Sequence, residues 1–222
     1  MKLYVPFFLA SSALALGCVS MAEDDLDETE LVDGDDAELG TASAALTTPA
    51  VLELINTCDS SPVRLVAATN NKFVLDPGNG SQIFKARLTG IKLVCAVGVR
   101  FNVPAGHRAR LGQSTTFGEF ETNSFPTGVV FTNQTGFTAN RRPATRADTQ
   151  FGPSVLKTQF LPKLSTGTVD VQHRGADPAN ALLVTECGAP NTWFYVRPSI
   201  DSGAAAVDLD GIVSSFKLEP CP

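Results

Sequence analysis

The chain has 222 residues, of which 43% are hydrophobic and 18% are charged, and its formal net charge at pH 7 is −6. This length suits one globular domain, which would bury about 70% of the surface of its unfolded chain. The charge is unevenly spread, because residues 23–38 hold ten acidic side chains, whereas residues 51–222 hold sixteen basic and thirteen acidic ones. The negative net charge therefore comes from the N-terminal region, and the rest of the chain is slightly basic. We expect no nucleic-acid partner and no cofactor.

The first eighteen residues, MKLYVPFFLASSALALGC, have the features of a bacterial secretory signal that ends in a lipid-attachment cysteine. Lys2 gives a positive start, an apolar run follows, and small residues precede Cys18. The run is shorter than the ~20 residues that a membrane-spanning helix needs. The sequence therefore predicts a signal over residues 1–18, lipid attachment at Cys18, and an outer-membrane or cell-surface lipoprotein whose partner is the membrane.

A second cleavage site leaves an alternative open. Ser20-Met21-Ala22 has the small-x-small pattern of ordinary signal peptidase sites, and cleavage there would remove Cys18 and release a soluble extracellular or periplasmic protein. Lipoprotein signals usually carry Leu where this chain has Ala15. We prefer the lipoprotein, because apolar side chains beside a cysteine at the end of such a run are uncommon by chance. The two or three acyl chains of a bacterial lipoprotein would suffice for stable attachment.

Residues 19–48 are predicted to form an acidic, disordered tether. Acidic side chains at this density repel one another, and the segment has too little apolar surface to offset the entropy of ordering. Calcium binding is less well supported, because the acids lack the glycine-punctuated spacing of a calcium loop. The acidic residues are Glu23, Asp24, Asp25, Asp27, Glu28, Glu30, Asp33, Asp35, Asp36 and Glu38.

From residue 49 onward the hydrophobic pattern has a period of two, which predicts strands, and no stretch has a convincing helical period. The expected strands are 51–55, 63–66, 72–75, 83–88, 91–103, 108–111, 128–131, 155–161, 168–172, 182–185, 193–196, 205–207 and 212–218. Turn residues separate many of them. Many short strands predict that residues 49–222 form an all-β domain, an antiparallel β-sandwich for which jelly-roll connectivity is one candidate.

Four cysteines lie in this domain, at positions 58, 95, 187 and 221. An even number in an exported chain predicts two disulfides. Of the three possible pairings we favour Cys58–Cys187 with Cys95–Cys221. A metal site is not expected, because the sequence has no CxxC pair and neither His107 nor His173 lies at ligand spacing from a cysteine.

Four motifs occur in an order and spacing that resemble a family of small secreted fungal and bacterial β-proteins catalogued as a domain of unknown function. They are Cys95-Ala-Val-Gly-Val-Arg-Phe-Asn-Val-Pro-Ala-Gly106, Phe151-Gly-Pro-Ser154, Glu186-Cys-Gly188 and Phe216-x-Leu-x-x-Cys221. Two positions depart from the family, since Leu218 replaces a Trp and Asp59 replaces a Pro. The resemblance implies a fold and secretion, and it implies no activity.

Two pairs of carboxylates could serve a hydrolase. Glu119 and Glu121 share one face of a strand, as do Asp208 and Asp210, and paired carboxylates can hydrolyse a glycoside if they flank the bond. A structural role is better supported, because alternation with apolar residues is typical of a half-buried strand and Asp210-Gly211 predicts a hairpin turn. The sequence has no GxSxG or HExxH motif.

Two aromatic side chains could stack on a sugar. Trp193 and Tyr195 are two residues apart and so share a strand face, although an apolar strand more often places such residues in a core.

Three arginines, Arg141, Arg142 and Arg146, lie close together in a segment without an apolar pattern. An ordinary solvated loop is the simpler interpretation, and a binding site for an acidic polysaccharide, another envelope component or the acidic tether is the functional one. The sequence as a whole predicts an exported, membrane-tethered, non-catalytic binding or structural module. The alternative is a secreted glycosidase-like hydrolase with a carboxylate pair.

Overall fold

A computed structural model describes residues 48–77, 84–123, 128–143, 153–174 and 183–222. The predicted signal, Cys18, the acidic tether and Arg146 lie outside these ranges. The described residues form strands and connecting segments, and among them no helix has the length and hydropathy of a membrane span. The strands are β1 (Ala50–Asn56), β2 (Arg64–Ala67), β3 (Lys72–Asp76), β4 (Ala86–Leu88), β5 (Val97–Asn102), β6 (His107–Thr122), β7 (Val129–Ala139), β8 (Ser154–Leu161), β9 (Thr166–His173), β10 (Thr192–Ile200) and β11 (Ala205–Pro220).

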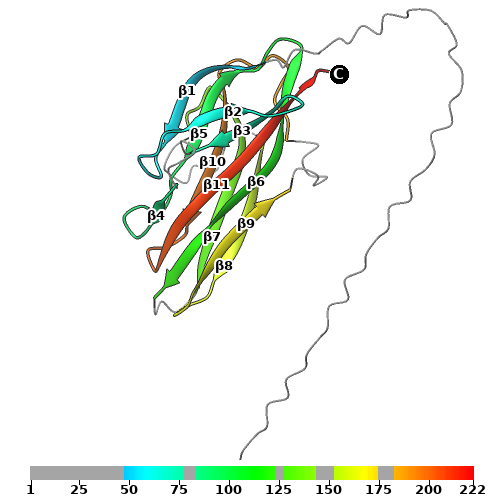
Figure 1. The fold of residues 1–222 in the computed structure, drawn as a ribbon. Helices are drawn as coiled ribbons and strands as arrows, with labels where there is room; N and C mark the ends of the chain where they lie inside the picture. Colours follow the sequence, from blue (N-terminus) through cyan, green and yellow to red (C-terminus); the bar gives the residue numbers. More distant parts are fainter. Residues whose placement is uncertain (1–47, 78–83, 124–127, 144–152, 175–182) are drawn as a thin grey trace, which may run out of the picture. The chain divides into compact units, whose positions relative to one another are not determined.

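These strands make two antiparallel sheets that pack face to face (Figure 1). Sheet A has the order β1-β5-β10-β7-β8, and sheet B has the order β2-β3-β11-β6-β9, with β4 paired to β11 beside β3. The predicted all-β sandwich is confirmed. The chain alternates between sheets at most connections, which is why the sequence gives many short apolar runs separated by turns.

The pairing of eight strands is nested in the manner of a jelly roll. β7 pairs with β8, β6 with β9, β5 with β10, and β3 with β11. A long antiparallel ribbon that folds over twice produces this nesting and places its alternate pairs in opposite sheets. β1 and β2 extend the two sheets at their edges.

β11 is one continuous strand where the sequence predicted a turn. It pairs with β6 from Ala205 opposite Thr122 to Pro220 opposite His107. The predicted hairpin at Asp210-Gly211 is wrong, because the register shifts there and Asp210 is accommodated as an extra residue within the ladder. A bulge of this kind uses the same residues as a tight turn while the strand continues.

A cluster of phenylalanines joins the two sheets at Phe216 of β11. Its fully buried ring stacks 4.8 Å from Phe101 of β5 and 5.4 Å from Phe73 of β3, measured between ring centroids. The edges of Phe194 and Phe137, from β10 and β7, approach the same ring at 5.0 and 6.0 Å. One side chain of sheet B therefore contacts three strands of sheet A as well as the neighbouring strand β3.

The disulfides are Cys58–Cys95 and Cys187–Cys221. The predicted pairing of Cys58 with Cys187 and Cys95 with Cys221 is wrong, and strand order explains why. β1 pairs with β5 so that Asn56 faces Val97. Cys58 and Cys95 lie two residues beyond this pair, one on each side, and are thereby brought together. Gly188 and Cys221 both donate backbone hydrogen bonds to the turn that opens β6, at the carbonyls of His107 and Gly106. The number of bridges is as predicted, and they indicate an oxidising compartment.

Phe216→Ala is expected to lower the free energy of unfolding by about 3–5 kcal/mol, because it removes a fully buried aromatic ring at the contact between the sheets. The measurement is chemical denaturation of the oxidised protein. Val213→Ala on the same strand is the matched control, since Val213 is 51% exposed and should cost less than about 0.5 kcal/mol. Equal effects of the two substitutions would contradict the assigned role of Phe216.

Candidate functional site

The arginine segment that follows β7 is partly engaged by a carboxylate. Arg142 is 66% exposed and lies 3.2 Å from Glu53 of β1, measured from Nε to Oε1. Arg100 of β5 approaches the other oxygen of Glu53 at 3.1 Å. Arg141 is exposed and also has an interaction partner. One carboxylate thus compensates part of the positive charge that the sequence placed here.

Trp193 and Tyr195 share a face of β10, as predicted. It is the outer face of sheet A, because the intervening Phe194 points into the core. Both rings are nonetheless covered, with exposures of 2% and 0%. Burial raises the pKa of Tyr195 to about 12. Trp193 packs with Ile55 and Ala96 and lies 5.9 Å from the Arg100 guanidinium, so neither ring offers an open surface to a sugar.

The candidate catalytic carboxylates lie on the outer face of sheet B. Glu119 of β6 is directly opposite Asp208 of β11, whose carboxylate lies 3.4 Å from Arg87. A hollow of about 370 Å³ is lined by Glu119, Glu121 and Asp208 together with residues of β9. All the lining strands belong to one sheet, so the carboxylates rise side by side from one surface and do not flank a bond. The hydrolase alternative gains no support here.

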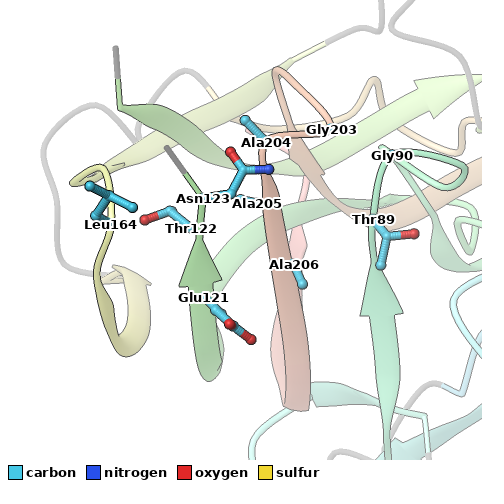
Figure 2. A pocket seen from close by; sticks show the side chains of 10 residues that line it. All are labelled: Thr89, Gly90, Glu121, Thr122, Asn123, Leu164, Gly203, Ala204, Ala205 and Ala206. Atoms are coloured by element: carbon cyan, nitrogen blue, oxygen red, sulfur yellow. The ribbon is translucent and has the colours of Figure 1, made fainter. Parts of the chain in front are cut away.

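A neighbouring pocket of about 540 Å³ lies where β6 ends and β11 begins (Figure 2). Its described lining consists mainly of small side chains, and Glu121 is the one titratable group among those residues. Gly203 and Gly90 approach so closely that a Cβ on Gly203 would lie 2.8 Å from the Gly90 Cα. The pocket therefore has few charged groups that could bind a ligand or catalyse a reaction.

The two histidines take separate positions. The Nδ1 atom of His107 lies 3.1 Å from the carbonyl oxygen of Ala105 in the turn before β6. His173 is buried on β9, opposite Ser114. Among the residues that the structure describes, no group of three or more His, Cys, Asp and Glu side chains is arranged to hold a metal ion.

A row of three cations crosses the other half of sheet B, and we call it the basic row. Lys217 of β11 is directly opposite Lys72 of β3 on one side and Arg110 of β6 on the other. All three project outward, because their neighbours Phe73, Leu218 and Leu111 point into the core. Directly opposed like charges destabilise a sheet, so this arrangement needs a reason other than stability.

Polar side chains surround the basic row. A hollow of about 430 Å³ is lined by Lys72, Arg110 and Lys217 and by Thr69, Asn70, Gln113 and Ser215. Asn70 and Asn71 have positive φ angles of 59° and 56°, which a two-residue hairpin turn of this kind requires and which asparagine tolerates. The turn between β2 and β3 thereby holds an exposed amide beside Lys72. Ammonium, guanidinium, amide and hydroxyl groups are the donors that anions bind in proteins.

Within the described part of the chain, a carboxylate holds only the arginine of the basic row. Arg110 donates two hydrogen bonds to Glu219, at 2.8 and 2.7 Å, and Arg108 donates a third at 2.6 Å. The pKa of Glu219 lies below its ordinary value, mainly because Arg110 donates a hydrogen bond to the carboxylate. Burial acts in the opposite direction and raises this pKa. Lys72 and Lys217 are exposed and make no ion pair with another described residue.

Sequence reasoning missed the basic row, because its members are 38 and 107 residues apart in the chain and sit in three different strands. Only the register of β3, β11 and β6 brings them together. Alternation within each strand gives their outward direction, but the sequence contains no local signal for the pairing.

No family model matches the chain, and no curated protein matches it. The resemblance to the secreted family of unknown function therefore stays a prediction. Among solved structures, the carbohydrate-binding module TmCBM61 in complex with β-1,4-galactotriose is 11% identical over 74% of this chain and 92% of that chain, with a TM-score of 0.27. The CBM35 module of Cellvibrio japonicus Abf62 is 14% identical over 78% and 99%, with a TM-score of 0.22. Neither likeness bears on a ligand of this chain.

Glu219→Gln is expected to lower the free energy of unfolding by about 1 kcal/mol at neutral pH, because it removes a carboxylate shared by two arginines. The pKa of Glu219 is lowered in the folded state, so its contribution is complete above the ordinary glutamate range and disappears as the pH falls through the folded-state pKa. Denaturation curves at several pH values measure the difference. Glu119→Gln is the control, and it should raise stability slightly because Glu119 opposes Asp208.

Proposed function

We propose that this protein is an exported, non-catalytic binding module for acidic polysaccharide, and that Lys72, Lys217 and Arg110 form its binding site. The observation that carries the proposal is the directly opposed pair Lys72 and Lys217, exposed and without a carboxylate partner among the described residues. Two ammonium groups in this position repel each other. A bound anion between them would turn that repulsion into attraction.

The surroundings of the basic row support a polymer more than a small anion. The hollow is open on the sheet surface, and a second hollow, lined by residues 68–71 and 217–220, continues from it along Lys217. The polar side chains on its rim can accept and donate hydrogen bonds to hydroxyl groups as well as to carboxylates. A chain of acidic sugars combines both kinds of group.

The arginine segment is a second candidate for the same ligand. Arg142 is more exposed than its partner Glu53, and the segment lies at the end of the sandwich where β10 begins and β11 ends. We favour the basic row, because Arg142 already has a carboxylate partner, whereas Lys72 and Lys217 have none among the residues that the structure describes.

The proposed location is the outer membrane or cell surface, with a lipid anchor at Cys18 and the tether as a spacer. Cleavage after Ala22, which would give a soluble protein, is the alternative. The oxidising environment that the two disulfides indicate is compatible with both.

Binding of alginate, a polymer of acidic sugars, tests the proposed ligand. The double variant Lys72→Ala/Lys217→Ala should bind about fivefold to thirtyfold more weakly at low salt, since each exposed charge contributes up to about 1 kcal/mol. Binding of the parent should weaken as salt rises, because screening acts over about 8 Å at physiological ionic strength.

Arg141→Ala/Arg142→Ala changes the net charge equally and is the matched control. Dextran, a neutral polymer, should not bind. A larger loss in the arginine variant than in the lysine variant would move the site to the arginine segment, and equal binding of alginate and dextran would contradict the electrostatic basis.

Lipid attachment is tested by growth with a labelled fatty acid. We expect the label to enter the parent protein and to be absent from Cys18→Ser, because the thiol is the acylation site. An unlabelled mature protein that begins at Glu23 would show that the soluble alternative is correct.

A further inference from the structure

The exposed face of sheet B is divided by charge along the strands β6 and β11. At one end lie Arg108 and Arg110 of β6 with Lys217 of β11, and at the other end lie Glu119 and Glu121 of β6 with Asp208 of β11. All six are solvent-accessible, and Glu219 and Arg87 each compensate part of the charge at their own end. The face therefore carries a positive half and a negative half.

An apolar strip separates the two halves. Phe117 of β6 is 40% exposed, and its ring lies across Gly211 of β11, where a Cβ would collide with it. Val213, the next outward residue of β11, is 51% exposed. Both are large apolar side chains that no described element covers, at the centre of a surface that is charged on either side.

On both strands the charges are symmetric about a line that passes beside Val213. On β6, Ser114 and Thr115 lie midway between Arg110 and Glu119 and equally midway between Arg108 and Glu121. On β11, Ile212 and Val213 lie midway between Asp208 and Lys217. Because Thr115 is opposite Val213, the two midpoints coincide to within one residue.

We propose that this face binds a second copy of the chain across a two-fold axis that lies in the interface and runs across the strands. Rotation about this axis lays β6 on β6 of the second copy and β11 on β11 with the strand direction reversed. Lys217 then faces Asp208 of the second copy, Arg110 faces Glu119 of the second copy, and each contact occurs twice. Val213 meets its own counterpart beside the axis, and Phe117 lies over Gly112 of the second copy, where apolar contact excludes water.

The charge distribution selects this orientation over the other two-fold arrangement. An axis parallel to the strands would place the basic half on the basic half of the second copy and the acidic half on the acidic half. Juxtaposed like charges disfavour a wrong arrangement, so electrostatics sets the orientation and the apolar strip adds attraction.

The dimer goes beyond the proposed binding function and can fail independently of it. The second copy would cover Lys217 and Arg110 with carboxylates and would place Arg87 over Lys72, so an acidic polysaccharide and a second copy would exclude each other. If the chain binds alginate but stays monomeric at all concentrations, the proposed function is supported and the dimer is ruled out.

The test is a charge exchange measured by sedimentation equilibrium on the exported chain without residues 1–18. At low salt the parent should dimerise reversibly. Lys217→Glu and Asp208→Lys should each weaken the dimer about tenfold or more, because each creates like-charge contacts twice. The variant with both substitutions should recover the parent's affinity to within about threefold, because opposite charges face each other again.

Lys163→Glu, in the exposed connection between β8 and β9, gives the same change in net charge as Lys217→Glu and should leave the dimer unchanged. Val213→Cys tests the axis directly, because a residue beside a two-fold axis meets its own counterpart and should form a disulfide-linked dimer under mild oxidation, whereas Lys163→Cys should not. A parent that stays monomeric at low salt, or a double substitution that fails to restore association, would overturn the proposal.

Discussion

The long antiparallel pairing of β6 with β11 determines both the interior and the exposed face of sheet B. Side chains alternate along a strand, so a shift of one residue would exchange the core set for the surface set. In the observed register Phe216 enters the phenylalanine cluster while Lys217 points outward beside Lys72 and Arg110. The two irregularities in this ladder, at Leu209/Gly211 and Ser214/Phe216, let both ends of so long a pair keep their apolar residues inside.

The sequence predicted those features that depend on local periodicity. Alternation gave the strands, the all-β class and the shared face of Trp193 and Tyr195, and the even cysteine number gave two disulfides. Features that depend on strand order could not be predicted from the sequence. The partner of Cys58 follows from the pairing of β1 with β5, and the basic row follows from the pairing of β3, β11 and β6. Asp210-Gly211 misled because a bulge and a hairpin turn draw on the same residues.

Opposed like charges occur at both ends of the exposed face, at Lys72 with Lys217 and at Glu119 with Asp208. Each pair costs stability, and alternating the signs across the strands would remove that cost. Proteins commonly retain such local conflicts where a ligand or partner resolves them. An anionic polymer at the basic end, or a second copy that brings opposite charge to both ends, would do so. The carboxylates of the acidic end lie on the same sheet surface, which suits contact with a partner better than catalysis between two groups.

We propose that the basic row is the surface that binds acidic sugars. Titration of the isotopically labelled protein with a short alginate oligomer, followed by NMR of the backbone amides, tests it most directly. We expect the largest shifts at Asn70, Lys72, Arg110 and Lys217, which come from three separate places in the sequence and one place on sheet B. Shifts concentrated at Arg141 and Arg142, or on the acidic half at Glu119 and Glu121, would contradict it.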